Sequence, residues 1–223
     1  MLYAITDRRL YGGNEAESRQ RLLEQAAVWA ASGVAFVHLR EKDLSSRELA
    51  ELARAMLRQI RQAQREPGVT HTTKLLINSR GDIALAVGAD GVHLPSGPDA
   101  LTPEEVRSIY TAAGCTQPPV ISTSCHRLAE VEAARRANVD CILFAPVFEK
   151  IIFDDTSRSD QRKLPGTGLS LLGEACRIAS HIPVFALGGI TVQNAAQCLD
   201  GGAAGIAAIR LLQEPAATWE KLA

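Results

Sequence analysis

A thiol and an imidazole stand side by side in Ser124-Cys125-His126, directly after the short apolar run Val120–Ser122. A cysteine thiolate with a histidine base is one arrangement used for nucleophilic catalysis. Neighbouring residues of an extended strand end, however, point to opposite sides. We therefore expect Ser124 and His126 to face one side, while Cys125 packs against helices as a small apolar residue and forms no dyad with His126.

Two cations follow another apolar run, Val34–Leu39, in the segment His38-Leu39-Arg40-Glu41-Lys42. Alternation sends His38, Arg40 and Lys42 to one side of the chain. Two positive charges on one side of a strand end indicate an anion site. The alternative is a salt-bridged surface in which Glu41 and Asp43 pair with the cations.

Backbone amides suggest a second anion site. Such amides bind phosphate well where a glycine turn precedes a helix. A plain turn is the alternative at each position. The candidate residues are Gly188, Gly189 and Ile190 after the run Val184–Ala186, Gly168 in Gly166-Thr167-Gly168, and Arg210 after the run Gly205–Ile209.

Metal ligands are scarce in the sequence. There is no HExxH, paired-cysteine or P-loop motif. The acids near strand ends, Asp7, Asp43 and Asp99, form no obvious pair for magnesium. Two further strands end in Asn78-Ser79-Arg80 and in His93-Leu94-Pro95-Ser96-Gly97, and each of these ends is compatible with an ordinary turn.

Eight short β-rich runs position these residues, and helical patterns lie between the runs. Several runs are apolar almost throughout, which is typical of strands that are covered on both faces. Eight such units predict one (β/α)8 barrel domain over residues 1–223, with its site at the carboxyl ends of the strands. An open doubly wound sheet is the alternative, but no glycine fingerprint follows the first strand. The runs are Leu2–Ile5, Val34–Leu39, Lys74–Ile77, Gly91–Leu94, Val120–Ser122, Cys141–Ala145, Val184–Ala186 and Gly205–Ile209.

The predicted helices have recognisable starts. Arg47–Gln64 carries apolar residues at helical spacing, with Ser46 or Ser45 as its cap. Thr102-Pro103 is a helix opening with threonine as the cap. Leu128–Ala137 and Val192–Leu199 follow the same scheme.

The segment Glu149–Pro165 interrupts this alternation of strands and helices. It is charged, polar and longer than an ordinary connection between a strand and a helix. We expect a mobile loop at the carboxyl end of the barrel, either as a lid or as a disordered insertion.

The composition excludes several classes of protein. The chain has 223 residues, 46% of them hydrophobic, and a net charge of −1, so nothing indicates nucleic acid or an anionic membrane as a partner. Five scattered cysteines without a CxxC pair favour reduced thiols in a cytoplasmic protein. The start MLYAITDRRL is unlike a secretion signal, and no run is long enough to span a membrane.

The motifs TDRRL, FVHLREKD, LLINSRGDIALAVGADGVHLPSG, STSCHRLAEVEAA, DCILFAPVFE, GTGLSLL, IPVFALGGIT and AAGIAAI occur in this order. Together they resemble the thiamine phosphate synthase/thiazole tautomerase (TenI) superfamily, from residue 3 to about residue 212. The resemblance implies a (β/α)8 barrel. One branch joins a pyrimidine pyrophosphate to a thiazole phosphate with magnesium, and the other aromatises a thiazole carboxylate phosphate by moving a proton.

Several positions are closer to the tautomerase branch. Ser79 stands where the synthase pattern has a magnesium-binding aspartate, and Asp99 comes one place later than the synthase's second acid. The pattern Ser-x-His followed by Leu-x-Glu is matched by Ser124, His126, Leu128 and Glu130. The resemblance implies that His126 is the acid/base and that Arg40 faces the substrate carboxylate or its surroundings.

The resemblance also implies that Gly168, Gly188, Gly189 and Ile190 hold the phosphate through their backbone. Arg210 departs from the family, which usually has a small residue there. It could grip the phosphate, fill the pocket or point outward.

We therefore expect a thiazole tautomerase-like isomerase that binds a small phosphorylated thiazole through Arg40, Lys42, Asn78 and Ser124. No cofactor is expected, with magnesium needed only by a synthase. A thiamine phosphate synthase with altered metal ligands, a non-catalytic sensor of a thiamine intermediate, and a barrel for an unrelated phosphorylated ligand are the alternatives. We expect a homo-oligomer, with a dimer favoured.

Overall fold

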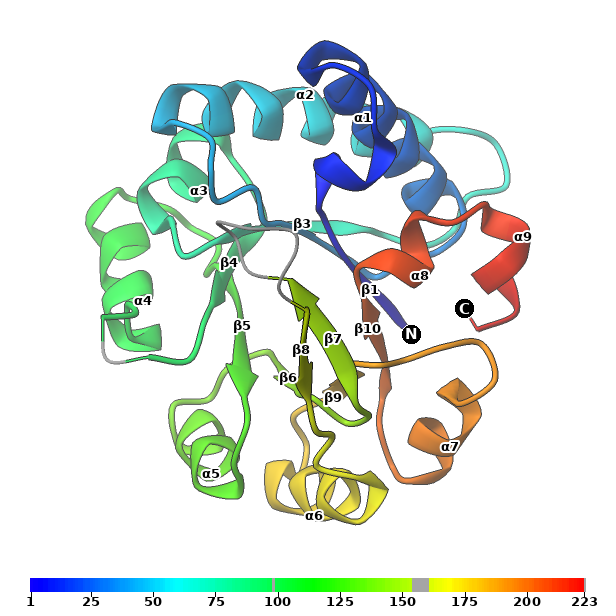
Figure 1. Ribbon diagram of the computed structural model, residues 1–223. Coiled ribbons are helices and arrows are strands. Elements are labelled where there is room, and N and C mark those ends of the chain that lie inside the picture. Colours follow the sequence, from blue (N-terminus) through cyan, green and yellow to red (C-terminus); the bar gives the residue numbers. More distant parts are fainter. Residues whose placement is uncertain (98, 154–160, 223) are drawn as a thin grey trace.

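Eight parallel strands close into a barrel in the computed structural model, which describes residues 1–97, 99–153 and 161–222. Around the ring the order is β1-β10-β9-β6-β5-β4-β3-β2, and helices surround it (Figure 1). Tyr3 of β1 pairs with Phe36 of β2 on one side and Ala207 of β10 on the other, which closes the ring. The predicted (β/α)8 barrel is confirmed.

The barrel strands fall where the apolar runs predicted them, with small shifts at their ends. They are β1 (Leu2–Ile5), β2 (Phe36–Leu39), β3 (Lys74–Asn78), β4 (Gly91–Leu94), β5 (Val120–Cys125), β6 (Cys141–Phe144), β9 (Val184–Leu187) and β10 (Gly205–Ala208). The largest difference is in β5, which continues through Ser-Thr-Ser to Cys125 because its polar side chains find buried partners.

Side chains of alternating strand positions fill the barrel interior. Tyr3, Leu76, Leu143 and Phe185 form an apolar cluster there, and the ring of Tyr3 lies 5.4 Å from that of Phe185 between centroids. The opposite strand faces pack against the helices in a separate, larger core. The barrel interior is therefore filled with side chains, and its polar side chains reach solvent only at the strand ends.

The covering layer contains α1 (Glu15–Ala31), α2 (Ser46–Ala63), α3 (Gly81–Val87), α4 (Pro103–Ala112), α5 (Leu128–Arg136), α6 (Leu169–Ala179) and α7 (Ala195–Asp200). The short helices η1 (Arg8–Tyr11), α8 (Arg210–Gln213), α9 (Ala216–Trp219) and η2 (Glu220–Leu222) complete it. None of the described helices has the length and apolar character needed to cross a membrane.

Helix starts follow the caps that the sequence offers. Ser45 caps α2 and Thr102 caps α4, each through a reciprocal capping box with a glutamate. Of the two caps considered for α2, Ser45 is therefore the one used. Helix α7 begins three residues later than predicted. The Asn194 side chain accepts from the Thr191 N–H and donates to the Gly189 carbonyl, and these two contacts stabilise a turn ahead of the helix.

The long segment after β6 differs from the irregular loop that was expected. Its flanks pair as an antiparallel hairpin of β7 (Lys150–Phe153) and β8 (Gln161–Leu164). In Figure 1 this hairpin is drawn across the centre of the ring of strands. The expectation of a mobile loop falls partly on residues 154–160, which lie outside the described residues.

Candidate functional site

His126 lies directly after β5, at the carboxyl end of the barrel. Its Nδ1 is 2.6 Å from the Ala145 carbonyl oxygen, and its backbone N–H donates to Glu130 Oε2 at 2.6 Å. A carbonyl oxygen can only accept, so Nδ1 carries the hydrogen. The neutral ring then has its lone pair on Nε2. An exposed imidazole with a fixed tautomer is suited to accept a proton at Nε2.

Cys125 is separated from this chemistry. Its side chain is 1% exposed and belongs to the core between the strands and the helices. Burial, and then the charge of Glu130, raise the pKa of the thiol to about 12. A thiol that stays protonated is a poor nucleophile, so a Cys125–His126 dyad is excluded.

Ser124 turns inward, as alternation predicted. Its Oγ lies 3.0 Å from His93 Nε2, and His93 Nδ1 lies 2.8 Å from Ser122 Oγ. Tyr3 Oη is 2.9 Å from the same Ser122 Oγ. This buried network joins β1, β4 and β5, and it fixes the His93 ring beneath the strand ends.

His38 occupies the neighbouring position on this floor. His38 Nε2 donates to Asn78 Oδ1 at 3.1 Å, and Asn78 Nδ2 donates to Ser79 Oγ at 2.9 Å. In the described part of the chain His38 Nδ1 is buried without a hydrogen-bond partner. Burial, and then the proximity of His93, hold the pKa of His38 well below its usual value. His38 is therefore neutral, with an acceptor lone pair on Nδ1.

Arg40 and Lys42 lie near these imidazoles, and Lys150 lies near Arg40. The charges of Arg40 and Lys42 both contribute to lowering the pKa of His38, after burial and His93. Burial, and then the charge of Arg40, lower the pKa of Lys150 on the hairpin strand β7. Arg40, Lys42 and Lys150 therefore give the site a positive potential that favours an anion.

The acids of the same segment serve a different cation. Arg8 donates to Glu41 at 2.8 Å and to both oxygens of Asp43 at 2.8 and 2.6 Å. A third carboxylate, that of Glu15, lies 2.8 Å from Arg8 Nε. Glu41 and Asp43 are thus engaged by Arg8, whereas the salt-bridged alternative assigned them to Arg40 and Lys42.

The glycines after β9 lie against the connection after β6. Gly188 and Gly189 have φ angles of 96° and 65°. An added Cβ would lie 2.7 Å from Pro146 at Gly188 and 2.5 Å from the Glu149 carbonyl at Gly189. Only glycine combines this backbone with such close packing.

The other predicted phosphate ligands are placed as follows. The Gly168 N–H donates to the Val147 carbonyl at 3.0 Å, so this amide is already used in the structure. Gly168 instead shapes the start of α6, with a φ of 85°. Arg210 is exposed at the first residue of α8, beyond β10. Phosphate binding by Gly188, Gly189, Ile190 and Arg210 stays a prediction.

The donors at these strand ends do not fit a magnesium ion. Ser79 and Asn78 bind each other, Glu41 and Asp43 bind Arg8, and Asp99 is exposed beyond β4. Within the described ranges no group of three or more His, Cys, Asp or Glu side chains is arranged so that it could hold a metal ion. Hard cations prefer several carboxylate oxygens, which this set does not offer free.

Some site residues were not predicted as such. His38 and His93 sit third in FVHL and GVHL, and period-two alternation could have placed both in the interior. Lys150 could not be predicted, because its position depends on the pairing of β7 with β8.

Comparisons with known proteins agree with this architecture. A family model described as thiamine monophosphate synthase (TMP-TENI) matches residues 2–212. A protein of Aquifex aeolicus, provisionally named thiamine-phosphate synthase 2, is 36% identical over 213 residues, covering 96% of this chain and 97% of the relative. Thiamine-phosphate synthase of Syntrophomonas wolfei is 36% identical over 211 residues, covering 95% and 87%. Among solved structures, thiamine phosphate pyrophosphorylase from Pyrococcus furiosus superposes with a TM-score of 0.72 at 26% identity, covering 99% of this chain and 90% of that one.

Proposed function

The chain belongs to the thiamine monophosphate synthase (TMP-TENI) family, and we propose that within this family it aromatises a phosphorylated thiazole carboxylate by moving a proton. The substrate class comes from the tautomerase branch that the motifs resemble. The reaction needs a base that removes a proton from one ring atom and an acid that returns one at another. No bond of the thiazole skeleton is broken.

The observation that carries the proposal is the hydrogen bond from His126 Nδ1 to the Ala145 carbonyl. It leaves Nε2 as the basic nitrogen at the carboxyl end of β5. An imidazole can both accept and return a proton, which suits it to act as base and as acid in turn. His126 would remove the proton through Nε2 and deliver it again as the imidazolium.

The rest of the site suits a doubly anionic thiazole. Arg40, Lys42 and Lys150 offer positive charge on the side of β2 and β7. The turn Gly188–Gly189 precedes Ile190 on the side of β9, where backbone amides would bind the phosphate. Carboxylate and phosphate at opposite ends would orient the ring beside His126, with Ser124 and Asn78 as polar contacts.

Thiamine phosphate synthase is the second candidate, because the relatives named above carry that name. The cationic side could hold the pyrophosphate of a pyrimidine substrate. Against a synthase, Glu41 and Asp43 are bound by Arg8, and among the described residues no group of three or more such ligands could hold a metal ion. No step is assigned to the metal for this reason.

Two assays on the same preparation separate the candidates. One follows aromatisation of the thiazole carboxylate phosphate tautomer by its ultraviolet absorbance. The other follows pyrophosphate release when the chain is mixed with the pyrimidine pyrophosphate, thiazole phosphate and magnesium. Aromatisation that is insensitive to EDTA, without pyrophosphate release, supports the proposal, whereas rapid pyrophosphate release supports the synthase and overturns it.

A further inference from the structure

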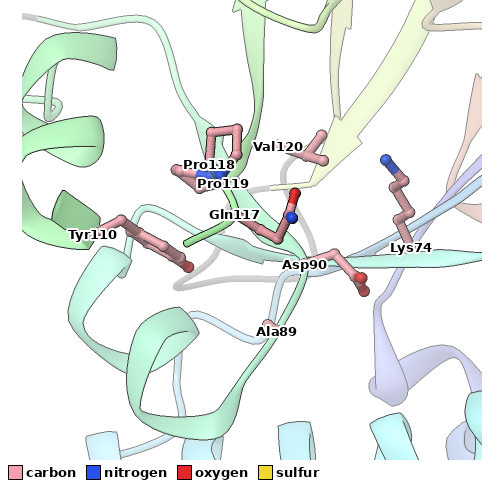
Figure 2. Close-up of a pocket in the computed structure, with 8 residues that line it drawn as sticks. All are labelled: Lys74, Ala89, Asp90, Tyr110, Gln117, Pro118, Pro119 and Val120. Carbon is pink, nitrogen blue, oxygen red and sulfur yellow. The ribbon is translucent and has the colours of Figure 1, made fainter. Parts of the chain in front are cut away.

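A cavity of about 300 Å³ opens at the end of the barrel opposite the candidate site (Figure 2). It lies at the amino-terminal ends of β3, β4 and β5. Its walls include Lys74, which begins β3, Asp90, which precedes β4, and Tyr110 of α4. Pro118 and Pro119, ahead of β5, supply rigid apolar wall. This volume is at the small end of the range for small-molecule sites.

Two side chains of opposite charge line the cavity without pairing. Lys74 and Asp90 both stand on one side of it in Figure 2, but no salt bridge joins them within the described residues. Asp90 Oδ2 accepts a hydrogen bond from the Leu75 N–H at 2.8 Å. Lys74 and Leu76 are two positions apart in β3, so their side chains leave the same face of the strand. Leu76 belongs to the cluster inside the barrel, and the Lys74 side chain therefore starts on that face. A ligand with one charge of each sign would complement both groups.

Tyr110 supplies the second observation. The residue is 7% exposed, and its hydroxyl is buried with no hydrogen-bond partner in the described part of the molecule. In Figure 2 the phenol reaches in from the wall opposite Lys74, with the Gln117 amide between them. A buried hydroxyl without a partner costs free energy, which a bound ligand would recover.

We propose that this cavity binds a small zwitterion of the amino-acid class. The ligand's ammonium group lies against Asp90, its carboxylate against Lys74, and its apolar part against Pro118 and Pro119. The Tyr110 hydroxyl and the Gln117 amide complete the polar contacts. Cavity size, the two opposite charges and the unpaired hydroxyl all point to this class, and the site is separate from the anion site at the other end of the barrel.

The test uses L-valine as the probe and the full chain labelled with nitrogen-15. Titration with L-valine should give saturable shifts of the Asp90, Gly91, Gln117 and Val120 amide signals. Isobutylamine and isobutyrate keep the apolar part but carry one charge each. Each should bind at least about tenfold more weakly, since one charged hydrogen bond is lost.

A matched pair of variants separates binding from folding. Asp140 has the same backbone role as Asp90, since its Oδ2 accepts from the Ile121 N–H at 2.7 Å, but it does not line the cavity. Asp90→Asn should weaken L-valine binding at least about tenfold, and Asp140→Asn should leave it unchanged. Tyr110→Phe should also weaken binding without loss of thermal stability.

The proposal is overturned if L-valine gives no saturable shifts, or if the shifts map to the carboxyl ends of the strands. Equal weakening by Asp90→Asn and Asp140→Asn would also overturn it, because the effect would then come from the backbone contact that both share.

Discussion

His38 and His93 stack on each other beneath the strand ends, with ring centroids 4.1 Å apart and an angle of 33° between the planes. Two protonated imidazoles at this distance would repel strongly. Burial, and then the charge of Arg40, lower the pKa of His93 to about 3. The floor of the site is therefore neutral, and the positive charge is confined to the cations above it.

The neutral pair makes folding sensitive to acid. Below a pH of about 6.5 the unfolded chain takes up protons on these histidines while the native state does not. The stabilisation is complete above that pH and is lost as the pH falls toward the pKa of about 3 of native His93. Within that window each histidine lowers the free energy of unfolding by about 1.4 kcal/mol for every unit by which the pH falls.

His93→Gln tests this linkage. Urea unfolding at several pH values should show that the fall in unfolding free energy from pH 6.5 to 5 is shallower in the variant, by about 1.4 kcal/mol per pH unit. Comparison of the two proteins at pH 7.5 measures the packing loss separately. Parallel curves for the two proteins would show that His93 is not the buried neutral group described here.

Arg8 is expected to matter for stability through Glu41. The Glu41 side chain is 2% exposed, and burial raises its pKa despite the Arg8 contacts. Arg8→Met leaves this carboxylate buried without its partner, which should cost about 3–5 kcal/mol of unfolding free energy at neutral pH. Arg9→Gln, which removes a partly exposed contact to Asp43, should cost less than about 1 kcal/mol.

A double variant identifies the cause. Arg8→Met with Glu41→Gln should recover most of the loss, because no buried charge remains. An equal loss in the single and double variants would mean that Arg8 acts through packing of its stem.

Gly189→Ala should disturb the expected phosphate turn. The new Cβ meets the Glu149 carbonyl and the Phe148 side chain, and the φ of 65° is itself unfavourable for alanine. Gly88 at the end of α3 is a matched control, because its φ of 68° lies in the left-handed region but its added Cβ would meet nothing within 4 Å.

Both alanine variants should lose roughly 1–2 kcal/mol of unfolding free energy, because alanine is less stable than glycine in a left-handed backbone conformation. Only Gly189→Ala should also weaken binding of thiazole phosphate, as measured by calorimetry. Equal affinity in the two variants would remove this turn from the phosphate site.

Arg40→Gln should weaken binding of the thiazole carboxylate phosphate by about 10–100-fold, because one charge-assisted contact is lost. The loss should shrink when the carboxylate is absent, in thiazole phosphate. A loss of the same size for both ligands would place Arg40 at the phosphate instead.

Much of the architecture could be predicted from the sequence, because eight apolar runs recur with helical patterns between them. The strands Leu2–Ile5 and Gly91–Leu94 match the structure at both ends. The motifs also indicated the superfamily, which the family match confirms. The choice between its two branches stays a proposal, and the relatives' names favour the synthase.

The features that sequence reasoning missed depend on contacts between distant residues. Arg8 and Glu41 are 33 positions apart, and neither periodicity nor a motif joins them. The apolar run predicted a strand only as far as Ser122, because the buried partner of the polar strand end, His93, lies on another strand. The β7–β8 hairpin pairs antiparallel, and its second strand, Gln161–Leu164, is mostly polar, unlike the buried parallel strands around it.

Proton transfer by His126 is the central claim, and exchange in deuterated water measures it most directly. Wild-type protein should place solvent deuterium in the aromatic thiazole product within one turnover. His126→Gln should slow this step by about 10²–10⁴-fold while ligand affinity stays within about twofold. Deuterium transfer at the wild-type rate in His126→Gln, or no aromatisation by the wild-type protein, would contradict the account.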